Sequence, residues 1–230
     1  MRRALCLCLL ACSAQARMVH ESADSFRLQA QRAPSAQPNR PETRVLPQRT
    51  AAPFCAYVSV GHINAGKAIE IQGVLGDVVA EASPTGEVQV LAVPKSGTGD
   101  LTEVQMQVRD HEGGTTVTVD YSRGSAAQVD FKVLVPAGVK FVGRTRLGRV
   151  AASLPNNIVE AHTVQGDVEL NTTGLTRAST VNGSITATLT GPNPVDLRTV
   201  NGDVTVTVPR LDGPLLTLWT THGDIRVLTR

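Results

Sequence analysis

Cysteine is scarce in this chain, and its placement excludes an internal disulfide framework. Of the 4 cysteines, Cys6, Cys8 and Cys12 lie close to the N-terminus, and Cys55 stands alone further on. A lone cysteine has no partner for an intramolecular bridge. No nucleophile motif surrounds Cys55, so we expect a small buried or half-buried thiol there.

Aromatic side chains and concentrated positive charge are also lacking, which argues against a nucleic-acid-binding protein. Aromatic residues make up 3% of the chain, too few for a base-stacking platform. The formal net charge is +2, and it is carried by arginines before Ala51, so the rest of the chain is slightly acidic. Nucleic-acid binding would require a concentrated basic face.

Long apolar runs and catalytic motifs are missing as well. No stretch is long enough to span a bilayer. The motifs H-E-x-x-H, C-x-x-C and G-x-S-x-G do not occur, nor does a phosphate-cradling glycine loop. We therefore expect a protein that is not an enzyme and that needs no cofactor.

A repeat fills the C-terminal half of the chain, and its clearest copy is Thr199 to Val208. Each copy has a central glycine, a threonine three residues before it, and apolar residues two and four residues after it. The glycines are Gly148, Gly166, Gly183, Gly202 and Gly223; the first apolar column is Val150, Val168, Ile185, Val204 and Ile225. Alternation of apolar and polar residues predicts strands with one buried face. Each copy thus reads as a strand, a tight corner and a second strand.

The corners leave two all-β folds open. Asn-Gly, as in Asn182-Gly183, tolerates positive φ and is also a strong hairpin signal. Like residues recurring in every copy favour in-register stacking, worth roughly 0.2–1 kcal/mol per contact. We therefore predict a β-solenoid, a β-helix-like stack of short coils, with a two-sheet sandwich of Asn-Gly hairpins as the alternative. The single tryptophan, Trp219, falls in the last copy and is expected to cover the end of the core, with contact to a sugar or a protein as the alternative.

One polar column follows the corner glycines and provides the candidate metal ligands. Asp203 and Asp224 would be neighbours about 4.8 Å apart if the copies stack, and a cation such as calcium could bridge them. The alternative is that each aspartate makes a local hydrogen bond at its turn. The dense Gly-Gly-x-Gly-x-Asp repeat of calcium-binding β-rolls is absent.

The N-terminus predicts an exported protein. Residues 1–16 have a basic start, an apolar stretch from Ala4 to Ala11, and the small-residue cleavage site Ala14-Gln15-Ala16. Leu9-Leu10-Ala11-Cys12 also resembles a lipobox, so Cys12 is a candidate for lipidation and membrane anchoring. The predicted location is the periplasm, the outer membrane or the cell surface.

The remaining chain divides into a linker and one domain. Residues 17–50, rich in Arg, Pro and Gln, lack periodicity and are predicted to be a disordered linker. Residues 51–230 alternate strand patterns with turn signals and are predicted to form a single all-β repeat domain without helices. Within it, Ala68 to Ala80 reads as an early, degenerate copy of the repeat.

The sequence resembles the bacterial "putative adhesin" domain family. The resemblance lies in Val133-Leu134-Val135-Pro136-Ala137-Gly138-Val139, followed by repeated Thr-Val-x-Gly-Asp-Val units, and covers roughly Ser59 to Arg230. It implies an exported protein with β-helix-like repeats. The family has no established catalytic residues, so the resemblance transfers none.

We therefore expect a non-enzymatic, adhesin-like cell-envelope protein that binds an envelope protein or a glycan. Two alternatives stay open. One is a structural or envelope-stress component without an adhesive role. The other is a carbohydrate-active enzyme on a β-helix, which would need paired carboxylates or basic residues in a groove.

Overall fold

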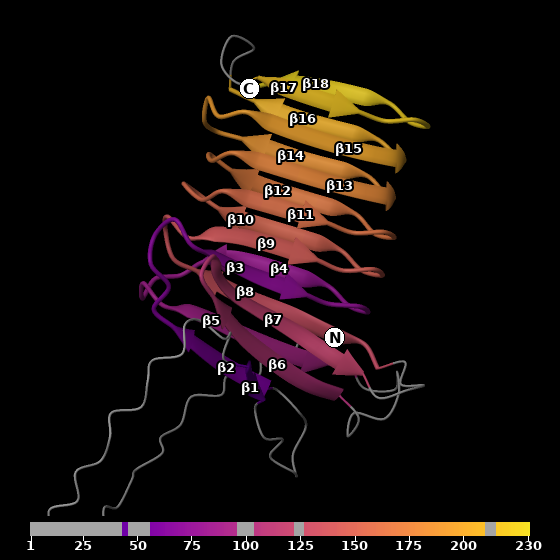
Figure 1. Cartoon of the computed structure of the whole chain (residues 1–230). Coiled ribbons are helices and arrows are strands. Elements are labelled where there is room, and N and C mark those ends of the chain that lie inside the picture. The colour runs from indigo at the N-terminus through magenta and orange to yellow at the C-terminus, as the bar shows by residue number, and fades with distance from the viewer. Residues whose placement is uncertain (1–42, 46–55, 96–103, 122–126, 210–214) are drawn as a thin grey trace, which may run out of the picture. The chain divides into compact units, whose positions relative to one another are not determined.

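The computed structural model describes residues 43–45, 56–95, 104–121, 127–209 and 215–230 (Figure 1). The predicted signal peptide, Cys12 and Cys55 lie outside the described residues. In chain order the strands are β1 (Thr43–Val45), β2 (Ala56–Gly61), β3 (Ala68–Gln72), β4 (Val78–Ala82), β5 (Val88–Pro94), β6 (Val104–His111), β7 (Gly114–Tyr121), β8 (Val129–Val135), β9 (Lys140–Arg144), β10 (Val150–Leu154), β11 (Val159–His162), β12 (Val168–Thr172), β13 (Thr176–Asn182), β14 (Ile185–Leu189), β15 (Val195–Asn201), β16 (Val204–Val208), β17 (Leu216–Trp219) and β18 (Ile225–Thr229).

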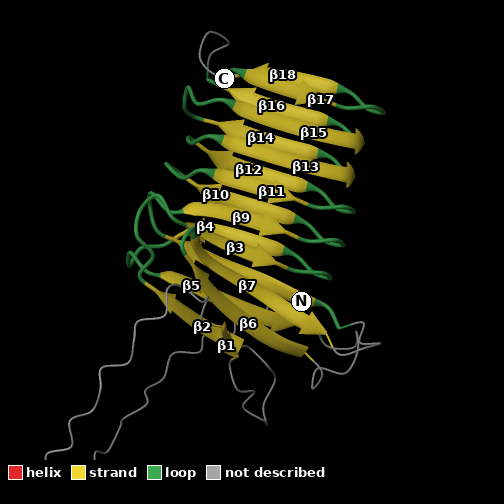
Figure 2. Cartoon of the chain, in the orientation of Figure 1, coloured by secondary structure: helices red, strands yellow, loops and turns green. Residues whose placement is uncertain are grey.

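The described residues are all-β, as predicted, and form two mixed sheets. The first sheet has nine strands in the order β1-β6-β7-β3-β9-β11-β13-β15-β17. The second has nine strands in the order β18-β16-β14-β12-β10-β4-β8-β5-β2. Figure 2 shows no helix among the described residues. Accordingly, this part of the chain offers no helix with the length and apolarity to cross a membrane.

Each copy of the repeat contributes one strand to each sheet. We call such a pair, with the glycine corner that joins it, a layer; the layers are β3/β4, β9/β10, β11/β12, β13/β14, β15/β16 and β17/β18. Corresponding strands of successive layers pair in parallel. The Asn182-Gly183 corner joins β13 in the first sheet to β14 in the second, so this corner is not a hairpin. The arrangement in two sheets is consistent with the two-sheet sandwich of the alternative prediction.

The predicted columns stack in register. Val168 pairs with Ile185, Ile185 with Val204, and Val204 with Ile225. Up to Val204 these residues are fully buried between the sheets, together with the leucine and alanine columns beside them. The core is therefore a narrow apolar interior that repeats from layer to layer, as expected for strands with one buried face.

Close contact between layers explains the corner glycines. Gly202 has φ of 146° and lies directly over Gly183, so that a Cβ at Gly202 would overlap the Gly183 carbonyl oxygen. The same overlap recurs along the column, at Gly148, Gly166, Gly183 and Gly223. Beside it, the Thr199 hydroxyl donates to the Gly183 carbonyl at 2.9 Å, and Thr145, Thr163, Thr180 and Thr220 make the equivalent bond. Each threonine thus ties its layer to the one before.

The early copy is the first layer, but the chain does not follow the stack in order. β3 and β4 pair with β9 and β10, so the layers continue across an insertion from β5 to β8. In the insertion β7 pairs parallel with β3 and β8 parallel with β4, while β6 and β5 add antiparallel strands outside them. One strand was not predicted. β1 lies within residues 17–50, which the sequence predicts to be a disordered linker, and it pairs antiparallel with β6.

Candidate functional site

Three surfaces of the stack carry side chains that could contact a ligand or partner. They are the outer face of the first sheet, the outer face of the second sheet, and the glycine corners between them. On both sheets the residues that alternate with the buried columns point outward.

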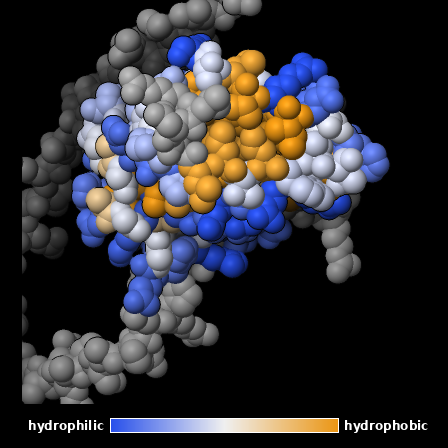
Figure 3. Space-filling view, turned by 90° about the horizontal axis from the view of Figure 1, so that it is seen from above, coloured by the Kyte–Doolittle hydropathy of each residue, from blue (hydrophilic) through white to orange (hydrophobic). Residues whose placement is uncertain are grey.

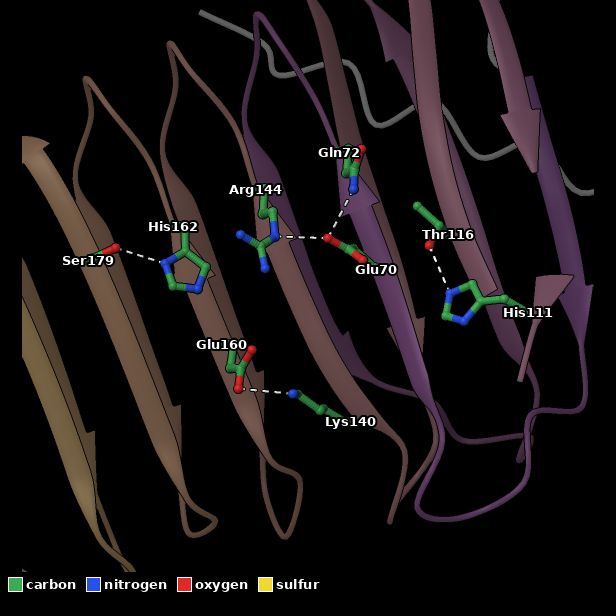
Figure 4. A network of polar contacts seen from close by, with 9 residues as sticks. All are labelled: Glu70, Gln72, His111, Thr116, Lys140, Arg144, Glu160, His162 and Ser179. Carbon is green, nitrogen blue, oxygen red and sulfur yellow. Dashed lines mark hydrogen bonds and ion pairs between the residues drawn. The ribbon is translucent and has the colours of Figure 1, made fainter. Parts of the chain in front are cut away.

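The outer face of the first sheet carries a polar network built from neighbouring strands (Figure 4). Arg144 on β9 contacts the preceding layer, where its Nε donates to Glu70 Oε1 on β3 at 2.8 Å. The same carboxylate accepts from Gln72 Nε2 at 3.0 Å, and Lys140 pairs with Glu160 at 2.9 Å. In both ion pairs a basic side chain of β9 meets a carboxylate of a neighbouring strand, so the charges within this network offset one another.

His162 on β11 belongs to this network and is partly buried. Its Nδ1 lies 2.7 Å from the Ser179 hydroxyl. Burial, and then the positive charge of Arg144, lower the pKa of His162 below 6.5, against the opposing attraction of Glu160 and Glu70. The imidazole is therefore held neutral at physiological pH, with Ser179 as its neighbour.

The outer face of the second sheet is hollowed. The hollow has a volume of about 470 Å³ and lies over β4, β10, β12 and β14. Small side chains create it, because Ala151 and Ser153 on β10 stand in register between Val79 and Glu81 on β4 and Glu169 and Asn171 on β12. The outward side chains that line it are Val79, Glu81, Ala151, Ser153, Glu169, Asn171, Thr186 and Thr188.

Ion pairs flank the hollow and hold its two carboxylates. Lys132 Nζ lies 3.0 Å from Glu81 Oε2, and Arg149 Nη1 lies 3.1 Å from Glu169 Oε2. All four side chains are about half exposed. Its lining combines valine and alanine side chains with carboxylate, amide and hydroxyl groups, so the hollow can both accept and donate hydrogen bonds.

The candidate ligands Asp203 and Asp224 are neighbours, and they are joined by the backbone. Asp203 Oδ1 accepts from the backbone N–H of Asp224 at 2.9 Å. Asp167 receives Ser184 N–H in the same way at 2.8 Å, and Asp77 receives Arg149 N–H at 2.9 Å. Each of these carboxylates thus accepts a backbone hydrogen bond from the next layer. Asp224 instead pairs with Arg226 at 3.1 Å, and no group of three or more His, Cys, Asp or Glu side chains that could hold a metal ion occurs among the described residues.

Trp219 does not cover the end of the core, which corrects the sequence expectation. Its side chain is 49% exposed and follows Leu218, which packs against the core. Trp219 pairs with Arg198, in a column that faces outward from the first sheet. The alternation of Leu216, Thr217, Leu218 and Trp219 indicates this placement, since Trp219 lies out of phase with the leucines.

The sequence analysis did not predict the hollow, and the sequence contains only part of the information that indicates it. Ala151 and Ser153 mark it as small residues at outward positions of one copy. Their neighbours Glu81 and Glu169 come from other layers, and only the register across the insertion brings them to the same face.

Comparison with known proteins finds similarity among solved structures alone. No protein-family model and no curated protein matches the chain. The similar structures include a "putative cell adhesion protein" from Clostridium sporogenes, with 7% identity, a TM-score of 0.43, and coverage of 83% of this chain and 100% of that one. A "putative adhesin" from Bacteroides fragilis has 11% identity and a TM-score of 0.37, covering 77% and 98%. A "putative adhesin" from Parabacteroides merdae has 13% identity and a TM-score of 0.22, covering 76% and 96%.

The predicted resemblance to bacterial "putative adhesin" proteins is thus found again among solved structures. With TM-scores below 0.5, we derive neither a binding site nor a ligand from these proteins.

Proposed function

We propose that this chain is an exported, non-enzymatic, adhesin-like protein of the bacterial cell envelope, and that it binds a partner protein or a glycan there. In this proposal the parallel layers form a β-solenoid that acts as a rigid support. The N-terminal signal directs export to the periplasm, the outer membrane or the cell surface. Mass spectrometry of the mature N-terminus distinguishes cleavage before Arg17 from lipidation of Cys12.

The observation that carries the proposal is the hollow on the second sheet. Its side chains stand on strands that pair in register on both sides, so the pairing of the sheet sets the backbone positions from which they extend. A preorganised site loses less conformational entropy on binding than a mobile one. Ser153, Asn171 and Thr186 supply the mixed donors and acceptors that hydroxyl or amide groups of a ligand require.

The ion pairs of the two carboxylates in the hollow support binding over glycoside hydrolysis. A glycoside hydrolase needs one carboxyl group that can act as an acid. Glu81 and Glu169 are instead each paired with a basic side chain, Lys132 and Arg149.

Filling the hollow tests the proposal. We expect Ala151→Trp to abolish retention of the purified chain on isolated cell-envelope fractions, because the indole occupies the ligand's space. The matched control is Thr118→Trp, at an outward position of β7 on the first sheet, and it should bind like wild type. Both variants should keep the wild-type circular dichroism spectrum.

Two results would contradict the proposal. Wild-type protein that is not retained on any envelope fraction would favour the structural or envelope-stress role. Equal retention of Ala151→Trp and wild type would exclude the hollow as the binding site.

A further inference from the structure

Four outward side chains, which we call the indole row, form a straight line across the first sheet. His162 on β11 pairs with Ser179 on β13. Ser179 pairs with Arg198 on β15, which in turn pairs with Trp219 on β17. Neighbouring strands are about 4.8 Å apart, which makes the row about 14 Å long. Figure 3 looks along the stack and shows a central apolar area with hydrophilic side chains around it, on the flanks that the outward columns form.

The polar members of the indole row are held by contacts that leave further groups available. His162 Nδ1 lies 2.7 Å from the Ser179 hydroxyl (Figure 4). Arg198 donates to Asp196 twice, from Nε at 2.7 Å and from Nη2 at 3.0 Å. Within the described part of the chain, three polar groups of the row make no hydrogen bond: His162 Nε2, Arg198 Nη1 and the Trp219 indole N–H. The row therefore offers oriented groups with which a ligand can form hydrogen bonds.

An apolar row runs beside the indole row, on the side of the glycine corners. It consists of Val164, Val181 and Val200, each two residues after a member of the indole row and therefore on the same outward face. Val164 and Val181 are exposed, as is Trp219. The two rows together form a strip that combines aromatic and aliphatic surface with hydrogen-bonding groups.

The charges along this strip offset one another. Each basic side chain beside the row is paired with a carboxylate: Arg198 with Asp196 at 2.7 Å, and Lys140 and Arg177 with Glu160 at 2.9 and 3.9 Å. The lowered pKa of His162 keeps its ring neutral at physiological pH. An acidic ligand would have to compete with these carboxylates, so the strip suits an uncharged ligand.

We infer that the indole row and the valines beside it bind an extended, uncharged oligosaccharide. A sugar ring presents a C–H face, which packs on an indole or on aliphatic side chains, and hydroxyl groups at its edge, which bond to groups such as Arg198 Nη1 and His162 Nε2. A chain of such rings in an extended conformation follows a straight row. A protein partner fits less well, because a strip about 14 Å long and two residue rows wide is much smaller than the roughly 800 Å² that a stable interface covers on each partner.

This site is separate from the hollow, which lies on the second sheet, and the inference does not depend on it. An open strip covers one side of a sugar chain, whereas pockets bury about 70–90% of a ligand's surface. We therefore expect a dissociation constant on the order of 1 mM. Binding of this strength does not retain the chain on a washed envelope fraction, so the two sites are tested by different experiments.

The fluorescence of Trp219 tests the inference, because it is the only tryptophan of the chain. The emission of the full chain should change on titration with cellohexaose or chitohexaose, which are extended and uncharged. It should stay constant with hexagalacturonate, which is acidic. Arg198→Ala should raise the dissociation constant about tenfold, because it removes a charged hydrogen-bond donor. The matched control is Thr217→Ala, at the other outward position of β17, and it should bind like wild type.

Two further variants are measured by calorimetric titration with the same hexasaccharides. Trp219→Ala should show no binding while keeping the wild-type circular dichroism spectrum, since the side chain is exposed and lies outside the core. Ala151→Leu narrows the hollow without adding an indole, and it should bind like wild type.

Three outcomes would overturn the inference. Unchanged emission with both uncharged hexasaccharides would mean that the strip binds no such sugar chain. Equal binding of hexagalacturonate would mean that charge, and not the uncharged sugar surface, drives the contact. Binding that is lost in Ala151→Leu and kept in Trp219→Ala would place the sugar in the hollow, which contradicts this inference and supports the proposed function.

Discussion

Val204 and Thr205 are neighbours in β16, yet their side chains lie on opposite sides of the second sheet. Val204 is fully buried between Ile185 and Ile225, whereas Thr205 points outward and is partly exposed. We expect Val204→Asp to lower the free energy of unfolding by about 3–5 kcal/mol, because it places an unpaired charge in an apolar interior. Urea denaturation measures the change.

Thr205→Asp is the matched control for this substitution, since it introduces the same charge one residue along the chain. It should change the free energy of unfolding by less than about 0.5 kcal/mol, as surface substitutions usually do. Similar losses in the two variants would mean that the inward and outward columns are assigned wrongly.

His162 makes stability depend on pH. In the unfolded chain His162 gains a proton near its ordinary pKa of 6.5, while in the folded chain its lowered pKa keeps the ring neutral. The unfolded state therefore binds more protons, and folding stability falls as the pH drops below about 6.5, until the folded pKa is also passed. At higher pH the ring is neutral in both states, and this loss of folding stability is absent.

The variant His162→Gln isolates this contribution. We expect its urea midpoint to fall less than the wild-type midpoint between about pH 7.5 and about pH 5, because glutamine does not titrate. Glutamine can still hydrogen-bond the Ser179 hydroxyl. Parallel pH profiles for the two proteins would rule out His162 as the titrating group.

At the scale of the element, two features require glycine at the corners: a positive φ and the close approach of the preceding layer. We expect Gly202→Ala to cost at least about 3 kcal/mol, since the new Cβ overlaps the Gly183 carbonyl and the layers must separate. Gly86 also has positive φ, of 74°, but a Cβ there meets nothing within 4 Å. Gly86→Ala should therefore cost only the φ strain, about 1–2 kcal/mol.

Thermal or urea unfolding of the two variants compares these costs directly. Equal losses would show that φ strain alone explains the glycines and that the layers can separate freely at their corners.

The strands and their buried faces were predictable from local pattern, because alternation has a period of two and needs no knowledge of partners. The first apolar column begins the second strand of each copy, at Val150 (β10), Val168 (β12), Ile185 (β14), Val204 (β16) and Ile225 (β18). The path of the chain at Asn182-Gly183 was less determined, since a hairpin and a crossing between sheets place the same columns on one face. The structure shows the crossing, since β13 pairs with β15 in one sheet and β14 pairs with β12 in the other.

At the scale of the whole molecule, the insertion from β5 to β8 hides the order of the layers. Val78 pairs with Val150 across the whole insertion, and no local signal records that pairing. The hollow depends on it, because Glu81 and Ser153 become neighbours only through this register. The repeat pattern alone therefore could not predict the candidate site, although the sequence shows the small residues at its outward positions.

Each layer in the parallel part contacts only the layers before and after it. Gain or loss of one whole copy would lengthen or shorten the stack by about one strand spacing, 4.8 Å, and leave its cross-section unchanged. The number of copies after β3/β4 therefore sets the distance between the insertion, which pairs with β3 and β4, and the layer β17/β18. Duplication or deletion of a single copy would change that distance by one strand spacing.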